Sequence, residues 1–245
     1  TLPDARFPAT LPAISGANLT NLPSGGGGGG IGSFTGSSVA ISSDDTALTL
    51  DDGTDNKNIG MGDGAGQRIT SGYENIVLGE FAGERITSGK FNVILGTKAC
   101  RGGNGSRDVF VGSGSGGNSS GYTSGGSNAV LGYEAMKYIN YAYNSVAIGR
   151  EALMSSAGHN NVAVGYKAGE DLTSGNNNVF IGDQVGTSTS PSGAVTTASN
   201  TICIGNNSIT SAYVKVSWTV TSDERDKADI TPLVHGLSVI EAIIP

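Results

Sequence analysis

A three-residue apolar pattern recurs along most of the chain, each time closed by a glycine and followed by a polar stretch. Nine such phrases lie between residues 58 and 205, and they read NIGMG, NIVLG, NVILG, DVFVG, NAVLG, SVAIG, NVAVG, NVFIG and TICIG. Their closing glycines are 16 to 23 residues apart, and 17 is the commonest interval. Short β-branched runs bounded by turn residues predict strands, and a fixed period of this length predicts a solenoid.

The segments between the strands have a pattern of their own. AGQRITSG, AGERITSG and AGEDLTSG occupy 65–72, 82–89 and 168–175, and the glycine that ends each one predicts a turn back toward the next strand. One coil is therefore predicted to contain a strand, a corner of small residues, a second apolar position and a turn. At about 4.8 Å per coil, the array over 58–208 would be on the order of 40 Å long.

Strand periodicity predicts which side chains share a face, because successive side chains of a strand point in opposite directions. The two positions that flank the middle of each phrase are aliphatic, and we predict that they fill the inside of the roll. The middle position then points outward, and it carries Gly60, Val77, Ile94, Phe110, Val130, Ala147, Ala163, Phe180 and Cys203. Strands that are apolar on both faces require cover on both, which predicts that other copies of the chain cover the outer face.

Composition narrows the classes of partner. Glycine accounts for 40 of the 245 residues, an abundance that the repeat explains and that would otherwise indicate disorder. A net charge of −7 argues against a nucleic-acid-binding surface and leaves proteins or sugars as expected partners. No apolar run approaches the roughly 18 residues of a membrane helix, so we expect no membrane insertion. Cys100 and Cys203 are isolated and predicted to be buried, and we expect neither a metal nor a cofactor.

Three segments precede the array. Residues 1–24 hold four of the seven prolines and are predicted to be extended, 25–30 is a polyglycine hinge, and 31–57 is predicted to form an entry strand pair. Acidic residues gather in the last segment without the spacing of a calcium loop, which predicts a solvated face. These residues are Asp44, Asp45, Asp51, Asp52 and Asp55.

The pattern changes after the array. Residues 209–221 alternate as a closing strand that carries the single tryptophan, Trp218, and 222–245 begin with six charged residues in a seven-residue window. Taken by itself, this window predicts the start of a short C-terminal helix capped by Ser222 or Asp223. Apolar residues at helical spacing in 236–245 support that interpretation.

Two resemblances refine the fold. The phrase SVAIGREAL at 145–153, with NVAVGYKAG and NAVLGYEAM, looks like the head repeat of trimeric autotransporter adhesins. That resemblance covers 58–208 and implies an all-β fold, a homotrimeric left-handed parallel β-roll of about nine coils. The string PAISGANLTNLP within 1–24 resembles the linker repeats of tail fibres from marine and cyanobacterial phages.

Residues 222–245 resemble the start of the C-terminal intramolecular chaperone domain of endosialidase tailspikes and phage fibres. That family opens with Ser-Asp-x-Arg-x-Lys-x-x-Ile, followed by Pro, Gly-Leu and an Ile-rich helix, and these residues occur here in order. The resemblance implies a chaperone that trimerises the fibre and is released by self-cleavage, with Ser222 as nucleophile and Lys227 as its base. Asp226 replaces a usually apolar residue, and its carboxylate would hold Lys227 charged and weaken it as a base.

The combined expectation is a structural and adhesive segment of a phage tail fibre, extracellular on the virion and involved in host attachment. Its expected partners are two further copies of itself, other fibre or baseplate proteins, and a host cell-surface glycan or protein. A cellular trimeric adhesin head and a polysaccharide-degrading tailspike are the alternatives. The enzyme would need paired carboxylates at the corners. In a repeat, recurring corner carboxylates are more simply explained as solvated surface, and here they are Glu80, Glu84, Glu134, Glu151, Glu170 and Asp183.

Candidate receptor contacts lie where the period is broken. The inserted loops 113–128 and 186–200 depart from the 17-residue spacing, and loops of this kind carry binding surfaces on rigid scaffolds. Aromatic side chains that could stack on sugars, or could equally pack against a neighbouring coil, are Tyr122, Tyr138, Tyr141 and Tyr143.

Overall fold

The computed structural model describes residues 33–35, 38–41, 56–117, 125–139 and 141–215. Predictions that fall elsewhere lie outside the described residues. They include the extended segment 1–24, the polyglycine hinge and the C-terminal helix, together with the acidic cluster at 44–55, Tyr122, and Ser222 and Lys227.

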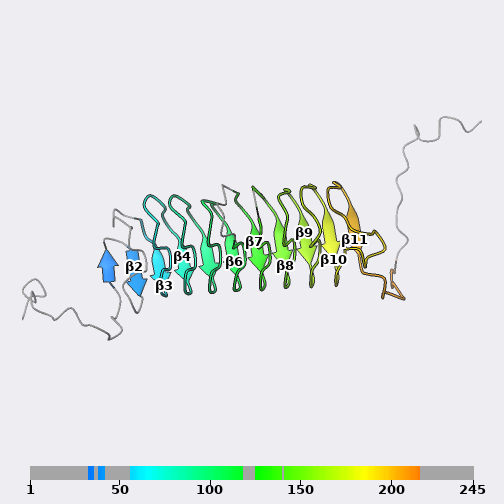
Figure 1. Ribbon diagram of the computed structural model, residues 1–245, viewed down its shortest axis with the longest axis horizontal. Coiled ribbons are helices and arrows are strands. Elements are labelled where there is room, and N and C mark those ends of the chain that lie inside the picture. The colour runs from blue at the N-terminus through cyan, green and yellow to red at the C-terminus, as the bar shows by residue number, and fades with distance from the viewer. Residues whose placement is uncertain (1–32, 36–37, 42–55, 118–124, 140, 216–245) are drawn as a thin grey trace, which may run out of the picture. The chain divides into compact units, whose positions relative to one another are not determined.

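The described residues form one sheet of short strands, without a helix (Figure 1). Strands β1 and β2 pair antiparallel within the predicted entry segment, and every later neighbour pair is parallel. Each of the nine phrases forms one strand, and the strands follow one another in sequence order. The strands are β1 Ser33–Thr35, β2 Ser38–Ile41, β3 Ile59–Met61, β4 Ile76–Leu78, β5 Val93–Leu95, β6 Val109–Val111, β7 Ala129–Leu131, β8 Val146–Ile148, β9 Val162–Val164, β10 Val179–Ile181 and β11 Ile202–Ile204.

The pairing register repeats without a slip from β2 to β11. The middle residue of each strand lies opposite the middle residue of the next, as Val77 does with Ile94 and Phe110 does with Val130. Parallel strands joined by connections of nearly constant length make a parallel β-solenoid, as the repeat predicts. Of the predicted closing strand, the described part, 209–215, contains no strand.

The closing glycines permit the sharp corner after each strand. Gly165 has a φ of 137°, and a Cβ atom placed on it would lie 2.2 Å from the carbonyl oxygen of Gly182 in the next coil. Backbone at this φ is open only to glycine, and the contact leaves no room for a methyl group. The glycine in every phrase therefore follows from the stacking of identical corners.

The predicted orientation of the strands is wrong. The middle residues point into the solenoid, and Val77, Ile94, Phe110, Ala147 and Phe180 are fully buried. The flanking residues that we predict inside are half-buried or exposed. Parity separates the two faces of a three-residue strand but does not say which one is inside, and here both faces are apolar.

Residue size explains why the middle residues fit inside. Phe110 lies against Gly116 at the corner of its own coil, where an added Cβ would be 2.3 Å from the ring. In the coil of β8 the relation is reversed, because the middle residue is Ala147 and Leu153 occupies the matching corner position. Phe180 and Gly186 repeat the first arrangement. The interior has a limited volume, so a large residue at one position requires a small one at the other.

A buried polar ladder runs along the inner edge of the sheet, formed by the residue before each strand. Asn75 donates both its backbone N–H and its Nδ2 to Asn58 Oδ1, at 3.0 Å each, and its Nδ2 also reaches the Gly89 carbonyl at 2.9 Å. Each net hydrogen bond of this kind contributes about 1 kcal/mol. The ladder residues are Asn58, Asn75, Asn92, Asp108, Asn128, Ser145, Asn161 and Asn178.

Asp108 departs from this ladder. Its Oδ1 accepts the backbone N–H and the Nδ2 of Asn128, at 2.8 and 3.0 Å, whereas its buried Oδ2 has no hydrogen-bond partner among the described residues. An asparagine would place a donor there, as Asn92 does toward the Gly105 carbonyl. Burial raises the pKa of the Asp108 carboxyl from its ordinary 3.8 to about 6, although the bonds from Asn128 act in the opposite direction.

Candidate functional site

The outer face of the sheet carries an exposed apolar surface, which we call the outer stripe. It consists of the two residues that flank the middle of each strand from β3 to β11, and all are aliphatic residues or methionine. None of them is buried: Ile59 is 38% exposed, Leu131 is 50% exposed and Ile202 is 69% exposed. The in-register pairing aligns these side chains in two continuous rows along the solenoid.

The outer stripe is unusual for a parallel sheet, because such sheets are normally covered on both faces. A monomeric protein rarely exposes a continuous apolar patch of more than a few hundred Å². Here eighteen side chains in nine strands belong to the stripe, and within the described part of the chain no element packs over them. The stripe is therefore a candidate assembly surface.

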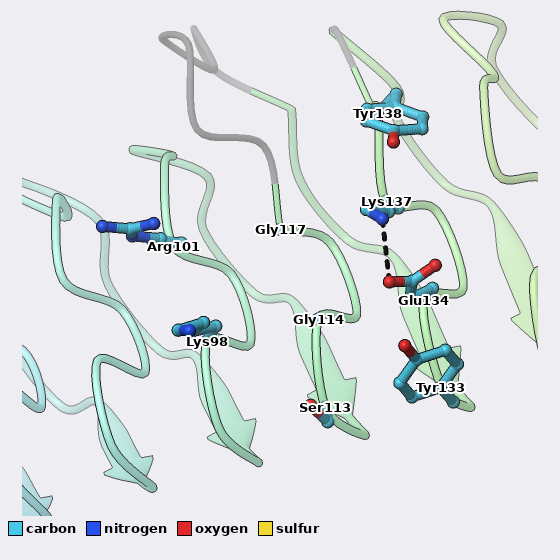
Figure 2. A pocket seen from close by; sticks show the side chains of 9 residues that line it. All are labelled: Lys98, Arg101, Ser113, Gly114, Gly117, Tyr133, Glu134, Lys137 and Tyr138. Carbon is cyan, nitrogen blue, oxygen red and sulfur yellow. Dashed lines mark hydrogen bonds and ion pairs between the residues drawn. The ribbon is translucent and has the colours of Figure 1, made fainter.

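A second surface feature lies at the corners, on the turns that follow β5, β6 and β7. It is a groove of about 410 Å³, which we call the corner groove (Figure 2). Lys98 and Arg101 form one wall, and Tyr133, Glu134, Lys137 and Tyr138 form the other. The coil between them contributes Ser113, Gly114 and Gly117.

The groove exists because one coil lacks large corner side chains. Counting from the closing glycine, the second position carries Lys98 in one coil, Gly114 in the next and Glu134 in the third. The fifth position likewise carries Arg101, Gly117 and Lys137. Because both positions in the middle coil are glycine, no side chain fills the space there, and we call this coil the empty rung. The walls are two coils apart, roughly 10 Å at the usual strand spacing.

The charges of the groove differ from one wall to the other. Lys137 Nζ contacts Glu134 Oε1 at 2.8 Å, a hydrogen bond that raises the pKa of the Lys137 ammonium. Arg101 forms an ion pair with Glu84, which lies outside the groove, and its side chain stays about one-third exposed. Lys98 is exposed and its Nζ has no hydrogen-bond or ion-pair partner among the described residues. The groove therefore has a cationic wall and a wall with a carboxylate.

The predicted tyrosines divide between this groove and other surfaces. Tyr138 lines the groove and is 47% exposed. Tyr141 and Tyr143 are exposed but do not line it, and the Tyr143 ring lies 5.2 Å from that of His159. Tyr133 and Lys98 are groove residues that the sequence prediction does not include. Aligning the coils on their closing glycines would have indicated them, because the empty rung is visible in that alignment.

The two inserted loops lie in different places in the structure. The first, 113–128, begins at the groove with Ser113 and Gly114, and its residues 118–124 lie outside the described ones. The second, 186–200, folds back on the solenoid: Val195 is buried, and its backbone N–H donates to the Gly186 carbonyl at 2.7 Å. Each loop borders a hollow: the first borders the corner groove, and the second contributes Ser190, Pro191 and Ser192 to a separate hollow of about 310 Å³ beside β11.

The corner carboxylates mostly form ion pairs along the coils. Glu134 pairs with Lys137, as described above, and Glu84 pairs with Arg101. Glu151 contacts Arg150 and Lys167 at 2.7 and 3.1 Å, and Lys167 also binds Glu170 at 2.9 Å. The hydrogen bonds that the Lys167 ammonium donates to Glu170 and Glu151 raise the pKa of Lys167. Glu80 and Asp183 lie at the surface.

Two further searches concern only the described residues. No three His, Cys, Asp or Glu side chains in them come together closely enough to hold a metal ion. That part of the chain also contains no helical segment with the length and hydropathy of a membrane span.

Comparison of the chain with protein-family models, with curated proteins and with solved structures found no match. The resemblances of 58–208 to adhesin heads and of 222–245 to fibre chaperones remain predictions from the sequence.

Proposed function

We propose that the chain is a structural and adhesive segment of a phage tail fibre, in which three copies associate in parallel through their outer stripes. The observation that carries this proposal is the outer stripe itself, a double row of aliphatic side chains left uncovered along β3 to β11. An elongated rigid shaft that self-associates along its length is suited to a fibre and has no need of a catalytic cleft.

A further copy of the same chain is the partner that matches the stripe best. Its rungs have the same spacing, so side chains of one copy can pack between those of another over the full length of the array. An unrelated partner would need the same period over nine strands. Association in parallel around a closed axis also covers every stripe without leaving an open edge for further growth. The number three is the one that the adhesin-head resemblance implies.

The proposed location is the virion, where the fibre would contact other fibre or baseplate proteins and a host cell-surface glycan or protein. Residues 222–245 would begin the chaperone that trimerises the fibre, and Ser222, activated by Lys227, would release it. The corner carboxylates support attachment over polysaccharide cleavage, because Glu84, Glu134, Glu151 and Glu170 are held in ion pairs.

The assembly is tested by measuring the native mass of the chain by light scattering together with its far-UV circular dichroism. We expect the mass of three chains, and a shift toward single chains when Leu131→Lys and Ile148→Lys are combined, because the charges would be desolvated in the interface. Ser71→Lys with Ser88→Lys is the matched control, since both serines are exposed on turns outside the stripe. A folded monomer for the unmodified chain would contradict the proposal.

The processing step needs a separate measurement. The chain is expressed with its natural C-terminal extension, and its denatured mass is compared with that of a Ser222→Ala variant. Chains that end next to Ser222 in the first sample, and full-length chains in the second, are the expected result. This outcome would also separate a tail fibre from a cellular adhesin head, because only the fibre interpretation includes a self-releasing chaperone. Full-length chains in both samples would overturn the processing role.

A further inference from the structure

We propose that the corner groove binds an acidic sugar, a pyranose that carries a carboxylate, with the carboxylate held by Lys98 and Arg101 and the ring packed beside Tyr133 and Tyr138. The inference deepens the attachment function proposed above and rests on it, because it names the class of surface glycan that would be recognised.

The groove has the size and form for such a ligand. Its volume of about 410 Å³ falls within the range of roughly 300–1,000 Å³ found for small-molecule sites. Its two walls are two coils apart, while Gly114 and Gly117 keep the space between them clear (Figure 2). The walls belong to a stacked solenoid whose backbone is hydrogen-bonded from coil to coil, as between Glu134 N–H and the Ser113 carbonyl at 3.0 Å. The site is thus largely formed before a ligand arrives.

The aromatic side chains provide a surface for the apolar face of a sugar ring. Tyr133 and Tyr138 are each close to half exposed, although neither lies on the outer stripe. Neighbouring cations hold them in place: Arg150 lies 5.6 Å from the Tyr133 ring centre, and Lys137 lies 5.1 Å from that of Tyr138. Rings restrained in this way lose little conformational entropy when a ligand packs on them.

The distribution of charge favours an acidic sugar over a neutral sugar or a polyanion. Lys98 has no partner among the described residues, and Arg101 has more donors than its pair with Glu84 uses. A carboxylate on this wall would meet the Lys98 ammonium, which is unpaired within the described part of the chain, and spare guanidinium N–H groups of Arg101. Glu134, on the opposite wall, accepts hydrogen bonds from hydroxyl groups and repels anions. A molecule with an anion at one edge and hydroxyls elsewhere fits both walls, whereas a uniformly anionic polymer fits only one.

The test uses two acidic probes and a neutral counterpart of each, titrated calorimetrically into the full chain at low salt. Tetragalacturonate is compared with its methyl ester, and 3′-sialyllactose with its methyl ester, so that each pair differs in the carboxylate. We expect at least one acid to bind, with affinity at least tenfold above that of its neutral counterpart. We also expect that affinity to fall as salt is raised, since the contact is partly exposed.

Variants assign the binding to the groove. Ser113→Glu places a carboxylate on the groove floor, and the fold should accept it because Glu80 occupies the same repeat position in another coil. It should abolish binding of the acid, whereas Ser113→Thr, which copies Thr97 at that position, should change affinity less than twofold. Lys98→Gln should weaken the acid at least fivefold, while Lys90→Gln, outside the groove, should leave the affinity unchanged.

The outcomes distinguish this inference from the proposed assembly, because light scattering and circular dichroism are recorded on the same samples. Failure of both acids to bind a folded trimer, equal binding of acid and neutral probes, or unchanged binding by Ser113→Glu would overturn the acidic-sugar site alone. A parent chain that is monomeric and binds the acid, together with a Ser113→Glu variant that does not bind it, would retain the site and overturn the trimer. A Ser113→Glu sample that is not folded would be replaced by Lys98→Gln, for which unchanged affinity overturns the site.

Discussion

The two faces of the one sheet follow different rules. On the inner face the middle residues range in size from Gly60 to Phe110, and the two largest, Phe110 and Phe180, each face a glycine at the corner of their own coil. On the outer face the residues stay aliphatic from β3 to β11, and the described residues contain no partner for them. An inner position is thus filled by side chains of the same chain, whereas the outer stripe has the composition of a surface that other copies cover. Packing on the inner face therefore stabilises a single chain, whereas packing on the outer stripe would stabilise an assembly of several chains.

The inner rule is tested most strongly by Phe110→Ala. Removing a buried aromatic ring should lower the free energy of unfolding by about 3–5 kcal/mol, because the narrow interior cannot collapse around the cavity. Adding Gly116→Leu should recover roughly half of this loss, since Ala147 and Leu153 form the same pair in the coil of β8 and Leu153 already has a positive φ of 47°. Urea unfolding at a fixed protein concentration measures both variants.

Gly116→Leu alone is the control for that rescue. It should destabilise the chain, because the added side chain meets the Phe110 ring in the parent background. Additive effects of the two substitutions would show that the middle residue and the corner residue do not compensate each other. The proposed rule for the inner face would then be wrong.

The next largest effect is a pH dependence of the free energy of unfolding, caused by the buried Asp108 carboxyl in the polar ladder. Because the folded pKa of Asp108 is raised to about 6, the folded chain holds a proton that the unfolded chain releases near pH 4. Stability should therefore fall as the pH rises from about 4 to 6 and stay lower above that. A shift of this size corresponds to about 2–3 kcal/mol.

Asp108→Asn should remove that pH dependence and raise the free energy of unfolding by roughly 2–3 kcal/mol at pH 8, since Nδ2 supplies the missing donor. Urea unfolding of both proteins at pH 4.5 and pH 8 gives the comparison. Asp171→Asn, on a corner away from the ladder, is the matched control and should change stability by less than about 0.5 kcal/mol at either pH. Equal stability of Asp108→Asn and the parent at pH 8 would contradict the ladder interpretation.

The smallest effect tests the outer stripe. Ile181 is 44% exposed in one chain, so Ile181→Ala should lower stability by less than about 1 kcal/mol in the dispersed background of Leu131→Lys with Ile148→Lys. In the assembling background the same truncation should be roughly 1–2 kcal/mol more destabilising, because neighbouring copies bury the side chain. Urea unfolding in both backgrounds gives the double-mutant cycle. The same loss in both would mean that the stripe near β10 stays exposed.

Much of the candidate site could be anticipated from residue types but not placed. Tyr138 is an aromatic residue that the sequence singles out, and it does line the groove. Lys98 and Arg101 belong to one coil and Tyr133 to another, two coils away, and they face one empty space only because Gly114 and Gly117 lie between them. Pattern analysis treats each coil alike, whereas a groove results from a difference between neighbouring coils.

The sequence by itself determined the period, the nine short strands within 58–205, their glycine-closed corners and the apolar character of both sheet faces. Those properties are local and repeated, so each copy of the phrase supports the others. Only the tertiary structure decided which face is inside, because a three-residue strand offers two equivalent parities until the corner side chains occupy the interior and leave space for the middle residues alone. It also decided that Asp108 Oδ2 would receive no hydrogen bond and that the coil with Gly114 and Gly117 would leave a groove. Both results depend on what the adjacent coils supply.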